Sequence, residues 1–240
     1  MKTTYILLSF LLSFSFAACS VKQNSIKGNT KMHKETRKLK AYDKVSLQGS
    51  FQINLVPGAE GNIAISAEEN LIPYIQTVIT GDQLHIQFES GYSYRPTEDI
   101  IITVPVEDLN EIKLVGSGDI KGEIPGKNEL ISLFLTGSGD LDLNIHSNEI
   151  NSSLVGSGDI VLTGETELLA TKLSGSGDFK AYDLKAYFIE ATIKGSGDME
   201  LYPIQSIEAK VLGSGDIVYK GNPKKEVINV TGSGNVHAAH

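Results

Sequence analysis

The sequence predicts an all-β fold: a right-handed, single-stranded parallel β-helix with coils of about 19 residues and an N-terminal β cap. Three observations lead to this prediction. The tetrapeptide Gly-Ser-Gly-Asp recurs at a nearly fixed spacing, apolar and polar residues alternate around each copy, and no stretch between copies has sustained helical spacing. The composition agrees with a turn-rich β protein, because the 240 residues include 24 glycines and only 7% aromatic residues.

The repeat itself sets the coil length. Six copies of Gly-Ser-Gly-Asp and a seventh that reads Gly-Ser-Gly-Asn begin 21, 19, 19, 20, 18 and 19 residues apart, at Gly116, Gly137, Gly156, Gly175, Gly195, Gly213 and Gly232. A period near twenty residues is typical of a solenoid in which each repeat is one coil. The leucine-rich repeat has a similar period, but its Leu-x-x-Leu-x-Leu framework is missing here.

Two apolar columns flank the repeat. The residue two positions before the first glycine is always aliphatic: Leu114, Leu135, Leu154, Leu173, Ile193, Val211 and Val230. The residue after the acid is also apolar: Ile120, Leu141, Ile160, Phe179, Met199, Ile217 and Val236. Strand alternation places both columns and both glycines on the inner face, so we expect a corner or narrow waist at each Gly-Ser-Gly. The rest of each coil predicts three short strands joined by three turns.

Residues 39–110 are predicted to form N-terminal capping coils, and residues 111–240 the regular coils. Strands are expected over 45–56, 62–67, 77–87 and 100–104, with one helical turn near 68–74. Gly49-Ser50 and Gly81-Asp82 resemble altered copies of the motif. No cap follows the last motif, so the final coil is either frayed or used in pairing.

The first eighteen residues read as a lipoprotein signal peptide. Lys2 precedes an uncharged apolar run over 5–16, which is too short to span a membrane, and small residues lead to Cys19. Phe16-Ala17-Ala18-Cys19 resembles a lipobox, and Cys19 is the only cysteine, so we expect it to be lipidated. The alternative is an ordinary cleavage site beside a chance cysteine.

Residues 19–38 are predicted to be a flexible basic linker. Residues 20–44 contain eight basic and two acidic residues, and apolar periodicity begins only near Leu39. This linker either contacts anionic lipid headgroups or has no specific role. Residues 45–240 contain twelve basic and twenty-seven acidic residues, a balance that argues against nucleic acid as a partner.

The chain resembles a known family in several motifs: Tyr42-Asp43-Lys44-Val45-Ser46-Leu47-Gln48-Gly49, Asn70-Leu71-Ile72, Ile101-Ile102-Thr103-Val104-Pro105, Leu109-Asn110-Glu111-Ile112 and the Gly-Ser-Gly-Asp series. Together these are similar to the "putative auto-transporter adhesin, head GIN domain" family of Bacteroidetes, over about residues 40–238. The resemblance implies a right-handed β-helix, export and an adhesin-like role, and it implies no catalytic residues. Residues 20–24 lack the acidic export signal of surface lipoproteins in that group, which favours the periplasmic face of the outer membrane over the cell surface.

In register, the motif acids form one row: Asp119, Asp140, Asp159, Asp178, Asp198 and Asp216. Carboxylates about 5 Å apart in water repel by roughly 0.8 kcal/mol per pair, so something must offset the repulsion. Local hydrogen bonds to the carboxylates are one explanation, and a ladder of weak Ca²⁺ sites is the other. No other cofactor and no dedicated metal site are expected.

We predict a non-catalytic envelope protein with an adhesin-like binding role. The seven serines have no paired histidine, the five histidines lack metal spacing, and no basic column accompanies the acids as a polysaccharide-cleaving site would need. The alternatives are a carbohydrate-active enzyme and a purely structural envelope protein. The 91–96 loop, with Tyr92, Tyr94 and Arg95, is the candidate contact surface for a protein or glycan, unless it is simply disordered. Ligand identity and oligomeric state are left open.

Overall fold

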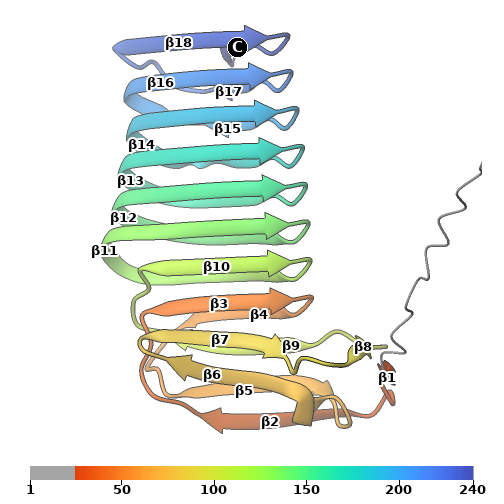
Figure 1. Cartoon of the computed structure of the whole chain (residues 1–240). Coiled ribbons are helices and arrows are strands. Elements are labelled where there is room, and N and C mark those ends of the chain that lie inside the picture. Colours follow the sequence, from red (N-terminus) through yellow and green to blue (C-terminus); the bar gives the residue numbers. More distant parts are fainter. Residues whose placement is uncertain (1–24, 240) are drawn as a thin grey trace, which may run out of the picture.

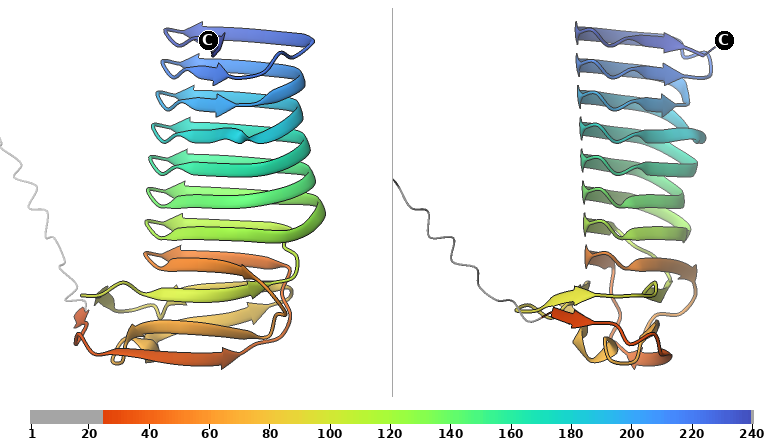
Figure 2. Two further views of the ribbon diagram at one scale, coloured as in Figure 1. Left: turned by 180° about the vertical axis from the view of Figure 1, so that it is seen from behind. Right: turned by 90° about the vertical axis from the view of Figure 1, so that its right-hand side faces the viewer.

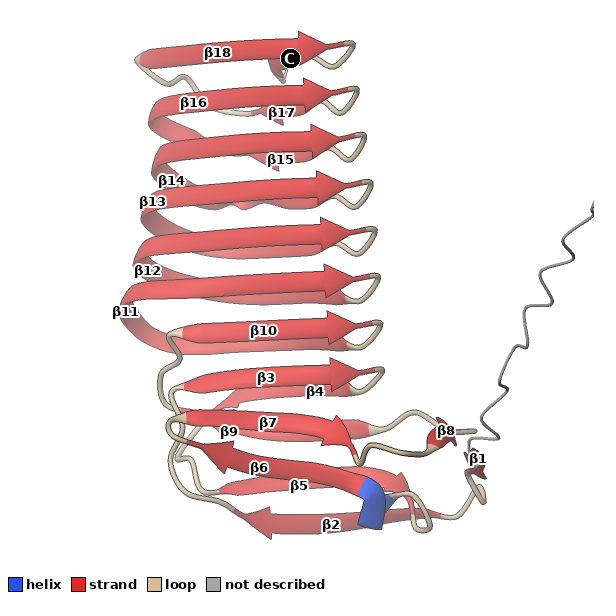
Figure 3. Cartoon of the chain, viewed as in Figure 1, coloured by secondary structure: helices blue, strands red, loops and turns tan. Residues whose placement is uncertain are grey.

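The computed structural model describes residues 25–239 and confirms the predicted β-solenoid (Figure 1). The chain runs along the near face toward the right, returns along the far face and climbs one coil at a time, which makes the coil right-handed. Within the described range there is no α-helix, and the one helical segment is the 3₁₀ turn η1 (Ile72–Tyr74), inside the stretch predicted for a helical turn (Figure 3).

The regular part of the solenoid is built from strands that pair in parallel with the strands of the next coil. In chain order these are β10 (Glu111–Gly116), β11 (Asp119–Gly137), β12 (Asp140–Gly156), β13 (Ile160–Gly175), β14 (Phe179–Gly195), β15 (Met199–Leu201), β16 (Pro203–Gly213), β17 (Ile217–Tyr219), β18 (Lys225–Gly232) and β19 (Val236–Ala238).

Each of β11 to β14 forms almost a whole coil. They contain 16 to 19 residues and bend from the far face to the near face without losing their pairing (Figure 2). The expectation of three short strands and three turns per coil is therefore corrected. In the coils of β11 to β14 only the Gly-Ser-Gly corner interrupts the strand, and in the upper coils a second break separates β15 from β16 and β17 from β18. The ladder survives the bend because β12 pairs with β13 in register from Leu141 to Gly156 with only Asn148 unpaired.

Both predicted apolar columns lie inside the solenoid. From Leu114 to Val211 and from Ile120 to Ile217, every member is at most 1% exposed. The last coil is the exception, since Val230 is 41% exposed where no further coil covers it. Each Å² of apolar surface that is buried stabilises the fold by about 25 cal/mol. Burial of these two columns is therefore the main driving force for the stacking of the coils.

Regular stacking begins earlier in the sequence than expected. β3 (Lys44–Gly49) and β4 (Gln52–Pro57) form a coil directly beneath β10 and β11, with Leu47 opposite Leu114 and Gly49 opposite Gly116. Gly49-Ser50 is therefore an altered copy of the motif, as predicted. Residues 58–110 leave this coil, form the cap below it and then return to begin β10.

The cap consists of β5 (Asn62–Glu68), β6 (Ile75–Thr80), β7 (Gln83–Phe88), β8 (Ser93–Arg95) and β9 (Ile101–Val106). β7 and β9 pair in parallel with β3 and β4 and add one more coil beneath them. The prediction that Gly81-Asp82 is an altered motif is wrong, because these two residues form the turn of the antiparallel β6–β7 hairpin.

The predicted flexible linker also requires correction over residues 25–38, the part of it that the structure describes. β1 (Ser25–Lys27) pairs in parallel with β8, and β2 (Met32–Lys38) pairs antiparallel with β5 along its whole length at the lower edge of the cap. Arg37 explains why this polar strand is ordered: its guanidinium donates hydrogen bonds to the carbonyl oxygens of Ile72 (3.0 Å) and Ile75 and to the hydroxyl of Thr77 (3.2 Å). The basic strand thus closes the open end of the core.

Candidate functional site

The Gly-Ser-Gly corners line up along one edge of the solenoid (Figure 2). The carbonyl oxygen of Gly137 accepts hydrogen bonds from the backbone N–H groups of Ser157 (2.9 Å) and Gly158 (3.2 Å) in the coil above, and every corner from Gly49 to Gly213 repeats this arrangement. A Cβ atom on Gly158 would lie 1.9 Å from the carbonyl oxygen of Gly139. The glycines are therefore required by the close approach of neighbouring coils, which accounts for the repeat without a ligand.

The motif aspartates form the predicted row, and each carboxylate from Asp140 upward binds the coil above it. The N–H of Asp159 donates to Oδ1 of Asp140 at 2.8 Å and that of Asp178 to Oδ1 of Asp159 at 3.0 Å; the pattern continues to Asn235. Asp119 lies below this chain of bonds, since the N–H of Asp140 donates instead to the carbonyl of Gly118. One oxygen of each participating carboxylate thus has a structural partner.

Lys180 offsets part of the repulsion in this row. Its ammonium nitrogen lies 2.8 Å from Oδ2 of Asp159 and 3.6 Å from Oδ2 of Asp178. Burial by itself raises the pKa of Asp159, but the hydrogen bonds from Lys180 and from the Asp178 backbone outweigh it, so this pKa is lowered. Among residues 25–239, no cluster of three or more His, Cys, Asp or Glu side chains could hold a metal ion. The Ca²⁺ ladder stays the alternative to these hydrogen bonds.

The predicted contact loop is an ordered aromatic cluster. Tyr94 lies in β8 and Tyr92 directly precedes this strand, and their ring centroids are each 5.6 Å from that of Tyr74. Tyr94 stacks on Phe88 with centroids 4.1 Å apart, while Tyr92 is 37% exposed. Arg95 is exposed at the end of β8. The cluster therefore packs on the half-buried Phe88 and has an exposed aromatic edge.

A second candidate site was not found from the sequence. A hollow of about 610 Å³ is lined by residues from successive coils near the middle of the long strands. The strands bend between the two faces of the solenoid in this region, at the left edge of Figure 1. We call it the lateral groove. It is lined in part by Glu129, Asn148, Glu149, Glu167, Leu168, Phe188, Glu190, Ser206, Glu208, Lys225 and Val227.

The lateral groove combines negative charge with exposed aromatic surface. Five glutamates and one lysine line it, so its potential is negative. Phe188 lines it and is 43% exposed, and the adjoining hollow of about 640 Å³ adds Tyr187, which is 40% exposed, and His146. Large exposed aromatic residues rimmed by polar groups are typical of an interaction surface.

A sequence signal for the groove existed in the outward-facing columns. Leu130, Glu149, Leu168, Phe188, Ser206 and Lys225 occupy one such column, one coil apart. The apolar residues at these outward positions, Leu130, Leu168 and Phe188, are the signal that indicates the groove. Coil lengths that vary from 18 to 21 residues, with register irregularities near Ile124 and Ala186, obscure the alignment.

The predicted signal segment and Cys19 lie outside the described residues, which begin at Ser25. None of the helical structure within residues 25–239 has the length and apolar character needed to cross a membrane.

Comparison with known proteins now identifies the family. The model of the "putative auto-transporter adhesin, head GIN domain" family matches residues 41–223. The chain belongs to this family. Membership confirms the resemblance found in the sequence and indicates an adhesin-like protein of the cell envelope or surface. None of the curated proteins matches the chain.

Solved structures agree with the head GIN fold. A putative adhesin from Bacteroides fragilis is 24% identical, with a TM-score of 0.82 over 89% of this chain and 100% of its own. A putative lipid binding protein from Parabacteroides distasonis is 26% identical, with a TM-score of 0.76 over 90% of this chain and 100% of its own. A putative adhesin from Parabacteroides merdae is 22% identical, with a TM-score of 0.69 over 90% of this chain and 100% of its own.

Proposed function

We propose that this head GIN protein is a lipid-anchored, non-catalytic binding module of the cell envelope, which uses the lateral groove to bind an extended, basic protein segment. The observation that carries the proposal is the combination of five glutamates with the exposed Phe188 along one continuous hollow. Carboxylates attract lysine and arginine side chains, and an aromatic ring supports both apolar contacts and cation–π contacts. A neutral glycan would use the aromatic rings but not the charge.

The anchor is proposed from the sequence. Cys19 is the only cysteine and follows Ala17-Ala18, and a lipidated cysteine carries acyl chains that contribute about 0.8 kcal/mol per buried CH₂. A relative described as a putative lipid binding protein supports a membrane-associated role. We place the anchored protein on the periplasmic face of the outer membrane, with the cell surface as the alternative.

The non-catalytic assignment rests on the polar groups of the groove. Glu129 accepts a hydrogen bond from Asn148 at 2.9 Å and Glu149 one from Asn151 at 2.8 Å, so these carboxylates are engaged in side-chain contacts. Arg95, the only arginine after residue 37, belongs to the cap. Relatives described as putative adhesins favour binding over turnover. A carbohydrate-active enzyme is the alternative, and a purely structural role is a further one.

The binding proposal is tested by site-specific crosslinking in the native envelope. A photoreactive phenylalanine derivative replaces Phe188, and the matched control replaces Phe134, which is similarly exposed (39%) but lies outside the groove. We expect a polypeptide adduct at position 188 alone, lost when Glu167→Lys and Glu190→Lys are added but retained with Glu123→Lys. Equal labelling at both positions, or a glycan adduct, would contradict the proposal. Release of reducing sugar from envelope polysaccharide would favour the enzyme.

The anchor is tested separately. Cells fed an alkyne-labelled fatty acid should label the wild-type chain but not the Cys19→Ala variant. Processing of the wild-type chain at an ordinary signal-peptidase site without labelling would show that Cys19 is not acylated.

A further inference from the structure

The first described strand fixes where an N-terminal anchor would meet the folded protein. Ser25, Ile26 and Lys27 pair with Ser93, Tyr94 and Arg95 in β8. Cys19 is only six residues before Ser25 in the sequence, and a chain spans at most about 3.6 Å per residue. An acylated Cys19 would therefore lie within roughly 20 Å of β8, at the cap end of the solenoid.

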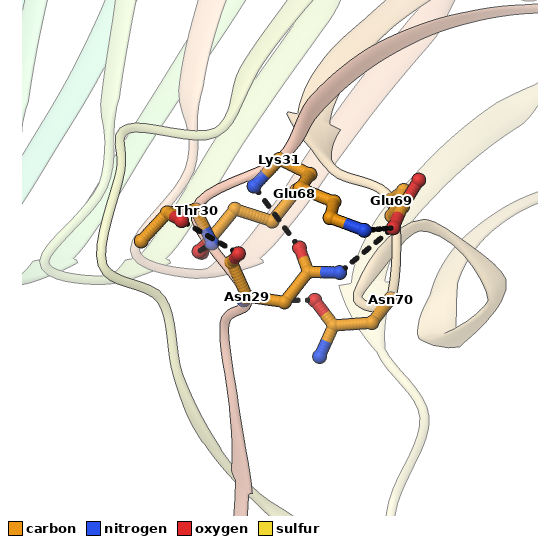
Figure 4. A network of polar contacts seen from close by, with 6 residues as sticks. All are labelled: Asn29, Thr30, Lys31, Glu68, Glu69 and Asn70. Atoms are coloured by element: carbon orange, nitrogen blue, oxygen red, sulfur yellow. Dashed lines mark hydrogen bonds and ion pairs between the residues drawn. The ribbon is translucent and has the colours of Figure 1, made fainter.

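Residues 29–31, which follow β1, are bound to the cap by a polar network (Figure 4). This network keeps β1 in place, so the distance from Cys19 to the cap stays short. The buried carboxylate of Glu68 accepts the Thr30 N–H at 2.6 Å and the Thr97 N–H at 2.9 Å. Thr30 has a φ of 63°, which a β-branched residue rarely adopts. Asn70 donates to the carbonyl of Lys27 and accepts from the N–H of Asn29, so the segment is held from both sides.

Two features of the surface beside β1 suit a phospholipid headgroup layer. The first is the tyrosine cluster, in which the centroids of Tyr74, Tyr92 and Tyr94 lie 5.6 to 6.1 Å from one another. Tyrosine gathers at membrane–water interfaces because its ring is apolar and its hydroxyl remains hydrated.

The second feature is a pair of like charges. Lys27 and Arg95 are register partners on neighbouring parallel strands, both are exposed, and neither has an ion-pair partner among residues 25–239. Like charges placed side by side across strands are destabilising without a counter-ion. The neighbouring Glu69 does not supply it, since it pairs with Lys31 at 3.6 Å. A lipid phosphate would satisfy both cations.

We propose that the tyrosine cluster and the Lys27–Arg95 pair form an interfacial contact with the phospholipid headgroups of the anchoring membrane. The solenoid then stands on its cap, and the lateral groove runs up its side across coils that lie above the lipid surface. This inference rests on the proposed acylation of Cys19, which would hold the cap close to the membrane. The tyrosine cluster and the Lys27–Arg95 pair would then make the contact with the headgroups.

The test uses the absence of tryptophan from the sequence. Acylated Tyr92→Trp protein, with acylation verified by mass, is reconstituted in vesicles of phosphatidylethanolamine and phosphatidylglycerol that contain a lipid brominated near the headgroup. The matched control is Tyr187→Trp, because Tyr187 is 40% exposed and Tyr92 37%. Tyr187 lies on β14, four coils and roughly 20 Å above β10.

We expect the tryptophan fluorescence of the Tyr92→Trp protein to be quenched roughly threefold more than that of the Tyr187→Trp protein, with a blue shift at position 92 alone. The pair Lys27→Glu and Arg95→Glu should reduce the quenching at position 92, whereas the solenoid control Lys172→Glu and Lys210→Glu should leave it unchanged. Equal quenching at 92 and 187 in acylated protein would overturn the contact and leave the proposed anchor intact. Absence of acyl mass in the wild-type chain would instead overturn the anchor and the contact that rests on it.

Discussion

A Cβ atom on Gly158 would lie 1.9 Å from the carbonyl oxygen of Gly139, its counterpart one coil below. The obstructing atom belongs to the backbone, so the coils would have to separate to admit even a methyl group. We expect Gly158→Ala to destabilise the protein by about 3 kcal/mol or more, measured as the free energy of unfolding in urea. Ser157→Ala is the control, because Ser157 is exposed and its backbone bond is retained. A loss below about 1 kcal/mol would show that the corners are not tightly packed.

The aspartate row should tolerate loss of charge but not loss of the acceptor. Oδ1 of Asp198 accepts the N–H of Asp216 at 2.7 Å. Asp198→Asn keeps an acceptor oxygen and removes one repelling charge, so we expect stability equal to or above that of the wild type. Asp198→Ala removes the acceptor and should cost about 1 kcal/mol. Equal destabilisation by both changes, in parallel urea titrations, would argue that the charge itself is needed.

We propose that this row acts through hydrogen bonds alone and holds no Ca²⁺. Lys180 already bridges Asp159 and Asp178, and the backbone occupies one oxygen of each carboxylate from Asp140 to Asp216. Millimolar Ca²⁺ and Mg²⁺ should therefore change the melting temperature equally at matched ionic strength. A rise specific to Ca²⁺ that disappears in Asp198→Asn would establish the cation ladder instead.

Acid should loosen the cap through Glu68. Burial by itself raises the pKa of this carboxyl, but hydrogen bonds from Thr97 and Thr30 outweigh it, and the pKa in the folded protein is lowered. A lowered pKa means that the stabilisation is present above the ordinary glutamate pKa and is lost as the pH falls through the folded value. Glu68→Gln should cost about 1–3 kcal/mol at neutral pH and flatten the part of the stability profile that lies below the ordinary glutamate pKa. Hydrogen exchange of the Thr30 and Thr97 amides reports the cap directly; unchanged exchange in Glu68→Gln would contradict the prediction.

The repeat made the regular coils predictable, because a glycine pair at a fixed period reflects close backbone approach and its apolar neighbours define the interior. Leu135 and Leu141 could be placed inside the solenoid from spacing alone, and both are fully buried. β2 could not be predicted in this way. Its residues Met32–Lys38 show no apolar alternation, and the strand is ordered by antiparallel pairing with β5 and by the hydrogen bonds of Arg37, which are distant in sequence.

Of the two candidate surfaces, the tyrosine loop could be predicted from the sequence and the lateral groove could not. Tyr92 and Tyr94 could be predicted because they are two residues apart in one short stretch, although the stacking of Tyr94 on Phe88 depends on the fold. The lateral groove draws Glu129, Leu168 and Phe188 from different coils, and only the observed register brings them together. A contact surface within one short segment could be predicted from the sequence, whereas a surface assembled from several coils could not.

The seam between β3 and β10 has a consequence for the order of folding. Leu114 pairs with Leu135, 21 residues later, and also with Leu47, 67 residues earlier. Closing the longer loop costs about 1 kcal/mol more in chain entropy. The coils above β10 can therefore nucleate and zip through near neighbours, while the seam is formed only after residues 58–110 have organised. Folding chains would pass through a stage with two separately ordered halves, in which the facing edges of β3 and β10 are both unpaired.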